Sequence, residues 1–235
     1  MKEKTVKNMS IVAVVGQKGG IGKTTIAIHL AVAATRAGHT TVLMDLDPQA
    51  SASKWSDIRT DDAPVVISAH ATRLRHVIDK AEANGVTFVV LDTPPQLESP
   101  ITDAAKVADL ALIPCRPALF DIHAIEETVY RTRKENVPTH LVFNAVPARS
   151  SMLKQAKEVV ADYNIQIAPC TVGRRILFSH AVVDGKTAEE FDPKSKAAAE
   201  IQTLYTYLEE QLTTQVRSTP DIHVPSIGIP NGGIV

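Results

Sequence analysis

The sequence predicts an α/β fold, a mostly parallel twisted sheet with helices on both faces. Three observations predict it. Continuous apolar runs recur along the chain, amphipathic stretches of helical length separate them, and a glycine-rich segment at residues 16–22 follows the first run. Strands buried on both faces are continuously apolar, and their alternation with helices is typical of βαβ units. The 235 residues suit one domain of this class.

The elements follow in a regular order. The first expected strand, residues 11–15, leads through the glycine-rich segment into a helix from about Lys23 to Ala37, which Gly38 ends. The other expected strands are 40–44, 65–68, 86–91, 108–114, 140–143 and 165–168, and the other expected helices are 73–84, 120–134, 150–163 and 193–212. We expect a domain at residues 10–217, a short extension at residues 1–9 and a flexible tail at residues 218–235.

Composition excludes several classes of protein. Cys115 and Cys170 are far apart and lack metal-ligand spacing, so a disulfide framework is not expected and a reducing cytoplasm fits. The histidines form no ligand pair typical of zinc sites. No apolar run approaches the roughly 18 residues of a membrane span, and we expect no membrane partner.

The glycine-rich segment has the chemistry of a phosphate-binding loop. Glycines let backbone N–H groups approach phosphate oxygens, and the following helix adds its positive N-terminal end. Lys23 should reach the β- and γ-phosphates, and the Thr24 hydroxyl should ligate Mg²⁺. The loop departs from the general Walker pattern at its first position and adds the lysine Lys18. The predicted nucleotide-binding residues are Gln17, Lys18, Gly19, Gly20, Ile21, Gly22, Lys23, Thr24 and Thr25.

Polar side chains follow several predicted strands where each strand ends. Asp45 and Asp47 follow the second strand, Asp92 follows the strand at 86–91, and Asn144 follows the strand at 140–143. Ligands of open parallel sheets bind beyond these carboxyl ends, and Walker B acids at this place hold Mg²⁺. A lone aspartate after a strand can instead be a cap or turn residue, and Asn144 can likewise be a turn residue.

On these residues the sequence resembles the deviant Walker A ATPases of the ParA/MinD family. Lys18 is similar to the family's signature lysine, residues 42–51 to its first switch, and residues 89–95 to its Walker B segment and second switch. The resemblance spans roughly residues 10–212. Residues 113–114 together with 117–122, and residues 185–198, resemble the ParA branch in particular.

The resemblance implies roles for individual residues and the cofactors ATP and Mg²⁺. Lys18 would reach across an ATP-bound dimer to the partner subunit's nucleotide, and Asp47 would orient the attacking water. Asp92 would hold Mg²⁺, Asp45 would support the Mg²⁺ shell, and Asn144 would read the adenine. The expected catalytic residues are therefore Lys18, Lys23 and Asp47, and the expected metal residues are Thr24, Asp45 and Asp92.

Within the family, the short ParA class without an N-terminal helix-turn-helix domain fits best, because only about ten residues precede the first strand. The resemblance implies a homodimer with ATP that binds DNA non-specifically and is nucleoid-associated. A ParB-like or ribbon-helix-helix adaptor would stimulate its slow ATP hydrolysis. One alternative is a positioning ATPase for a protein cargo. Another is a metabolic ATP-dependent enzyme of the dethiobiotin synthetase type, against which the switch at residues 45–49 argues.

Charge is unevenly distributed along the chain. Residues 131–175 contain eight basic and three acidic residues, a charge of +5, against about −6 for the remainder. This asymmetry is typical of a phosphate-backbone binder, and we expect one basic face. Arg174 and Arg175 are the best candidate DNA contacts, and Lys196 is a weaker one. The alternative is a set of basic helix faces that are simply solvated.

Overall fold

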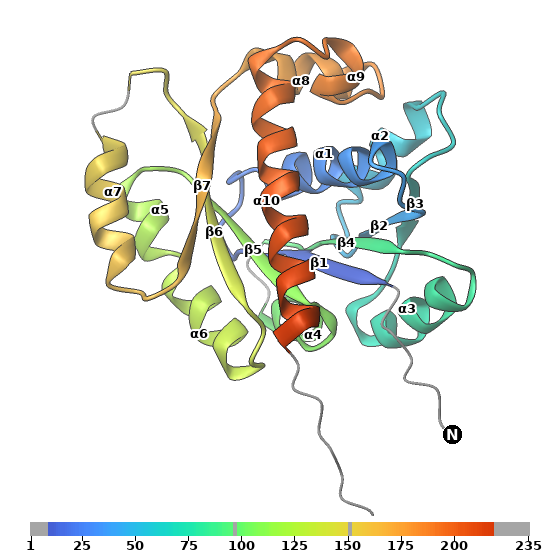
Figure 1. Ribbon diagram of the computed structural model, residues 1–235, viewed down its shortest axis with the longest axis horizontal. Helices are drawn as coiled ribbons and strands as arrows, with labels where there is room; N and C mark the ends of the chain where they lie inside the picture. The colour runs from blue at the N-terminus through green and yellow to red at the C-terminus, as the bar shows by residue number, and fades with distance from the viewer. Residues whose placement is uncertain (1–8, 96–97, 150–151, 219–235) are drawn as a thin grey trace, which may run out of the picture.

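The computed structural model describes residues 9–95, 98–149 and 152–218. The expected tail beyond residue 218 and most of the expected N-terminal extension therefore lie outside the described residues. A seven-stranded sheet runs through the molecule in the order β3-β2-β4-β1-β5-β6-β7 (Figure 1). Its strand pairings are all parallel, which confirms the predicted fold class. The strands are β1 Ser10–Val14, β2 Thr41–Asp45, β3 Val65–Ser68, β4 Phe88–Asp92, β5 Leu110–Cys115, β6 Thr139–Val146 and β7 Gln166–Gly173.

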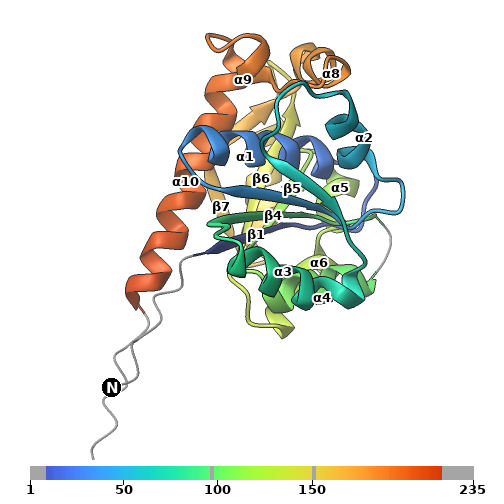
Figure 2. The same cartoon turned by 90° about the vertical axis from the view of Figure 1, so that its right-hand side faces the viewer.

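Helices cover both faces of this sheet, as Figure 2 shows from the side. Alternate residues of β1 point to opposite faces, with Ile11 and Ala13 in one apolar core and Val12 and Val14 in the other. The first core is closed by α3 Leu74–Ala83, α4 Glu98–Val107, α5 Leu119–His123, α6 Glu126–Lys134 and α7 Met152–Ala161. The second is closed by α1 Lys23–Arg36, α2 Ser51–Ile58, α8 Ile176–Val183, α9 Ala188–Phe191 and α10 Lys196–Ser218.

The expected strands all occur, but several helices were missed. The expected helix at residues 120–134 is divided into α5 and α6, and α2, α4, α8 and α9 have no counterpart in the prediction. α8 is apolar around most of its circumference and therefore lacks the alternation of faces that predicts a helix. β7 is longer than expected because its position at the sheet edge tolerates Pro169. None of the helices in the described ranges is long and apolar enough to cross a bilayer.

Candidate nucleotide site

The loop between β1 and α1 has the backbone that close approach to phosphate requires. Gly20 and Gly22 have φ values of 72° and 93°, a left-handed region that favours glycine. Gly22 is the N-cap of α1, and no side chain caps this helix end. Its first N–H groups are therefore available to an anion.

Asn144 fixes this loop from the end of β6. Its Nδ2 donates a hydrogen bond to the Ile21 carbonyl oxygen at 2.7 Å. A Cβ on Gly22 would overlap the Asn144 amide, so Asn144 can take this position only beside a glycine. Asn144 thus holds the phosphate loop in this structure, and its role in reading adenine stays a prediction.

Lys23, the first residue of α1, is a buried cation that faces carboxylates. It is 6% exposed, and its Nζ donates to the Lys18 carbonyl oxygen at 3.1 Å. Burial lowers the pKa of Lys23, and the Asp92 and Asp47 carboxylates partly offset that effect. A buried ammonium gains most from further negative charge, which the phosphates of a nucleotide would supply.

Asp92, at the end of β4, is fully buried, and among the described residues neither of its carboxylate oxygens has a partner in hydrogen-bond geometry, although the Thr24 hydroxyl lies close enough to lower its pKa. Burial raises its pKa to about 7; the Thr24 hydroxyl and the Lys23 ammonium act in the opposite direction, and the Asp45 carboxylate adds to the rise. An unpartnered buried carboxylate is costly, and a bound divalent cation would satisfy it. The residues present therefore fit Mg²⁺.

The described residues alone do not provide a complete set of metal ligands. Within the described part of the chain, no group of three or more His, Cys, Asp or Glu side chains could hold a metal ion. Mg²⁺ is usually held by one or two carboxylates together with phosphates and water. Asp92 and Thr24 match that mode of binding, with a nucleotide completing the site.

Asp45, at the end of β2, is buried but fully engaged. Its Oδ1 accepts a hydrogen bond from the Asp47 N–H at 3.1 Å, and its Oδ2 accepts from the Ser53 N–H at 3.0 Å and the Ser53 hydroxyl at 3.2 Å. Asp45 therefore fastens the segment that carries Asp47 to α2. Its predicted part in the Mg²⁺ shell stays a prediction, as does the orientation of water by Asp47.

Lys18 has a partner within its own chain. Its ammonium forms an ion pair with Asp121 of α5, whose side chain is 7% exposed against 41% for Lys18. Arg116 also contacts the loop, donating to the Gly20 carbonyl oxygen. Asp121 and Arg116 were not predicted from the sequence, because they follow β5 and only the sheet order brings them to the loop. For Lys18 to reach a second subunit, it must first leave Asp121.

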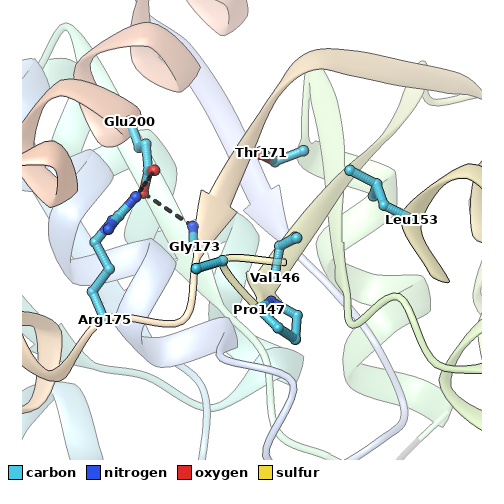
Figure 3. Close-up of a pocket in the computed structure, with 8 residues that line it drawn as sticks. Val146, Pro147, Leu153, Thr171, Gly173, Arg175 and Glu200 are labelled. Carbon is cyan, nitrogen blue, oxygen red and sulfur yellow. Dashed lines mark hydrogen bonds and ion pairs between the residues drawn. The ribbon is translucent and has the colours of Figure 1, made fainter. Parts of the chain in front are cut away.

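The candidate DNA contacts lie together at the carboxyl end of the sheet. Arg174 is exposed, and so is Lys196 at the start of α10. Arg175 is paired with Glu200, which also accepts a hydrogen bond from the Gly173 N–H at 3.0 Å (Figure 3). The pair borders a pocket lined by Val146, Pro147, Ala148, Leu153, Thr171, Gly173, Arg175 and Glu200.

The expectation of one basic face over residues 131–175 is wrong. The basic residues at 131–134 end α6 and precede β6, so they lie at the amino end of the sheet. Arg174 follows β7 and lies at the opposite end. Arg133 is moreover engaged by the Tyr163 and Asn164 carbonyl oxygens. A run of basic residues spanning a β-strand is divided between two ends of a parallel sheet.

The fold and these residues define a phosphate-loop nucleotide-binding protein. Residues 12–188 match the CobQ/CobB/MinD/ParA nucleotide binding domain. The chain belongs to this family, which confirms the predicted resemblance and assigns it to the ParA/MinD group of ATPases.

The curated relatives of this chain include proteins with two different named roles. The chain is 30% identical over 198 residues to the maintenance of carboxysome distribution protein A of Halothiobacillus neapolitanus, covering 80% of this chain and 90% of the relative. It is 27% identical over 236 residues to the chromosome partitioning protein ParA of Caulobacter vibrioides, covering 79% and 88%.

Solved structures share the fold. The septum site-determining protein MinD of Pyrococcus horikoshii, complexed with Mg-ADP, superposes with a TM-score of 0.73 at 17% identity, covering 88% of this chain and 98% of that one. The apo McdA structure from Cyanothece gives a TM-score of 0.70 at 12% identity, with coverages of 87% and 99%.

Proposed function

We propose that this protein is a ParA-type ATPase that uses ATP to form a homodimer, binds DNA non-specifically as that dimer, and releases it after hydrolysis. The observation that carries the proposal is the loop itself: Lys23 faces two carboxylates, and the second lysine, Lys18, is half-exposed beside it. A ParB-like or ribbon-helix-helix adaptor would stimulate hydrolysis. Basal turnover would be slow, below roughly 0.1 s⁻¹ by analogy with unstimulated phosphate-loop switches.

The residues of this chain divide the work. The backbone of residues 17–25 and the Lys23 ammonium would bind the phosphates, while Asp92 and the Thr24 hydroxyl would hold Mg²⁺. When bound, the metal ion would neutralise the charge that develops on the phosphates. Asp47 orients the water, and Lys18 exchanges Asp121 for the phosphate of the other subunit.

A protein cargo is the second candidate. The 30% identical relative is named for carboxysome distribution, and this supports a positioning ATPase that uses the same switch with another adaptor. In both candidate functions Arg174 and Lys196 provide the DNA contacts. Arg175, which is paired with Glu200, is a further DNA contact beside them. Pull-down with the chain's adaptor, followed by a test of whether that adaptor binds DNA or a protein assembly, separates the two.

Nucleotide turnover tests the site. Lys23→Ala or Thr24→Ala should abolish ATP hydrolysis, whereas Lys80→Ala, an exposed lysine on α3, should not change it. Unchanged turnover in Lys23→Ala would overturn the assignment of the phosphate loop.

Size-exclusion chromatography with ATP and Mg²⁺ tests the dimer. Asp47→Ala should trap a dimer because it keeps ATP and loses the positioned water. Lys18→Ala should bind ATP and stay monomeric. A monomeric Asp47→Ala protein, or a Lys18→Ala protein that dimerises normally, would contradict the proposed switch.

Co-sedimentation tests DNA binding. Binding should require ATP and Mg²⁺, show little sequence preference, and weaken with salt at a log–log slope of about −0.9 per phosphate neutralised. Arg174→Glu should weaken binding and leave dimerisation intact, while Arg75→Glu on exposed α3 serves as the matched control. A wild-type protein that ignores DNA at low salt would refute the DNA-binding part of the proposal.

A further inference from the structure

A buried cluster around Arg59, the residue that follows α2, joins segments far apart in the sequence. The Arg59 side chain is 3% exposed, and its guanidinium lies 4.5 Å from the centre of the Trp55 ring. Two of its nitrogens pair with Glu190 of α9 at 3.0 and 2.8 Å. The same two nitrogens also donate to the carbonyl oxygens of Gly185 and Ala63, at 2.9 and 2.8 Å.

Glu190 is itself held in place. Its carboxylate accepts hydrogen bonds from the Thr187 N–H at 2.7 Å and the Thr187 hydroxyl at 3.0 Å, which closes a capping box on α9. Burial opposes ionisation of Glu190, but these bonds and the one from Arg59 outweigh it and lower the Glu190 pKa. The Arg59–Glu190 pair is therefore ionised and bidentate. Bidentate pairing with a carboxylate fixes the orientation of an arginine most firmly.

The backbones of the two segments also meet. Gly185 has a φ of 64°, and a Cβ on it would lie 2.8 Å from the Ile58 carbonyl carbon and 2.9 Å from the Arg59 nitrogen. The Trp55 indole, 2% exposed, donates to the Lys186 carbonyl oxygen at 3.4 Å. The end of α2 therefore packs directly against Gly185 and Lys186.

The same segment is tied to the phosphate-loop helix. The Ala188 N–H donates to His29 Nε2 at 3.0 Å, and His29 Nδ1 donates to the Thr25 carbonyl oxygen at 2.7 Å. Nδ1 therefore carries the proton and Nε2 accepts. Burial lowers the His29 pKa to about 4, so the ring stays neutral near pH 7. Thr25 directly follows Thr24, the predicted Mg²⁺ ligand.

The other end of α2 holds the switch. Asp45 accepts hydrogen bonds from Ser53 in the first turn of α2 and from the Asp47 N–H. α2 is thus attached at its start to the segment that carries Asp47, and at its end, through Arg59 and Glu190, to the support of the phosphate-loop helix.

We propose that Arg59 is a positioning residue for ATP hydrolysis, which holds α2 and the attached Asp47 in register with the phosphate loop through Glu190 and His29. This inference rests on the proposed role of Asp47. A merely stabilising buried pair can often be replaced by apolar side chains without loss of stability. A pair that positions a water-orienting group cannot, because misplacement by about 1 Å can cost on the order of 100-fold in rate.

Steady-state ATPase kinetics on the full chain test the proposal. Arg59→Met keeps the length of the side chain and its contact with Trp55 but loses the fork. We expect kcat to fall roughly tenfold or more, with KM and the Kd for ATP unchanged within about twofold, because Asp47 acts on water and not on binding. Arg75→Met, which breaks the exposed Arg75–Asp79 pair on α3, is the matched control and should leave kcat unchanged.

Further variants distinguish positioning from stability. Glu190→Gln should lower kcat in the same way, the double variant should be no slower than Arg59→Met, and Arg59→Lys should restore only part of the rate. Gly185→Ala, which separates the backbones, gives an independent test if Arg59→Met does not fold. A folded Arg59→Met or Gly185→Ala protein with wild-type kcat, or one in which KM rises while kcat holds, would overturn the inference. Wild-type turnover in Asp47→Ala would instead overturn the proposed function.

Discussion

Asp45 at the end of β2 and Asp92 at the end of β4 differ in their partners although they occupy equivalent places. They are register partners on adjacent parallel strands, and both are buried, at 2% and 0% exposed. Asp45 accepts three hydrogen bonds from Asp47 and Ser53, whereas among the described residues neither oxygen of Asp92 has a partner in hydrogen-bond geometry, although the Thr24 hydroxyl comes near. Equal position and equal burial thus leave one carboxylate structural and the other available to a cation. The segments next to each aspartate account for the difference. α2 begins shortly after β2 and supplies hydrogen-bond donors to Asp45, whereas Asp92 lies beside the phosphate loop.

The largest effect should come from Asp92. Asp92→Asn should reduce ATP turnover by roughly 1000-fold, about 4 kcal/mol, because the metal's charge stabilisation is lost with its ligand. A phosphate-release assay over a range of Mg²⁺ concentrations measures it, with Asp79→Asn on α3 as the exposed control. Turnover close to wild type at ordinary Mg²⁺ would remove the contrast between the two aspartates.

The pH dependence of stability should reveal the same residue. The folded pKa of Asp92, about 7, lies above the ordinary aspartate value of 3.8, so the folded protein retains a proton that the unfolded chain releases. The protein without nucleotide should therefore lose stability as the pH rises from about 4 to about 7, by at most about 4 kcal/mol from this group. Urea unfolding across this range should show a flatter profile for Asp92→Asn, and an identical profile would contradict the unpaired carboxylate.

Asp45 should matter more for the fold than for metal binding. Asp45→Ala leaves three donors without their acceptor, so it should destabilise the protein by about 3 kcal/mol. Binding of ATP with Mg²⁺ should persist in the folded fraction, while hydrolysis falls because Asp47 loses its anchor. Calorimetric unfolding and nucleotide titration measure the two effects, and loss of Mg²⁺ affinity without loss of stability would restore the metal role predicted from the sequence.

The smallest effect is expected from Ser53, whose hydroxyl is one of the three donors to Asp45. Ser53→Ala removes the hydroxyl donor to Asp45 but keeps the Ser53 N–H, so it should cost only about 1 kcal/mol of stability. Ser56→Ala on the same helix is a matched control. If Ser53→Ala destabilises as much as Asp45→Ala, the carboxylate is held by fewer contacts than the structure shows.

Much of the site was predictable because it is local in sequence. The phosphate loop is a contiguous segment, and the predicted strand ends identified Asp45, Asp92 and Asn144. The prediction could not distinguish the two aspartates, because hydrogen-bond partners do not follow from a strand end. It also placed Arg174 and Arg131 on one face. Arg131 precedes β6 and Arg174 follows the parallel strand β7, so the two lie at opposite ends of the sheet.

The sequence by itself determined the α/β class, the phosphate loop and the family, because each depends on short-range pattern: apolar runs, glycines at fixed spacing, and lysines beside them. Only the tertiary structure decided which charges are paired. Lys18 meets Asp121, Arg175 meets Glu200, and Arg59 meets Glu190, at separations of 103, 25 and 131 residues along the chain. The order of strands in the sheet and the packing of helices against it bring such partners together, and neither can be read from any one segment.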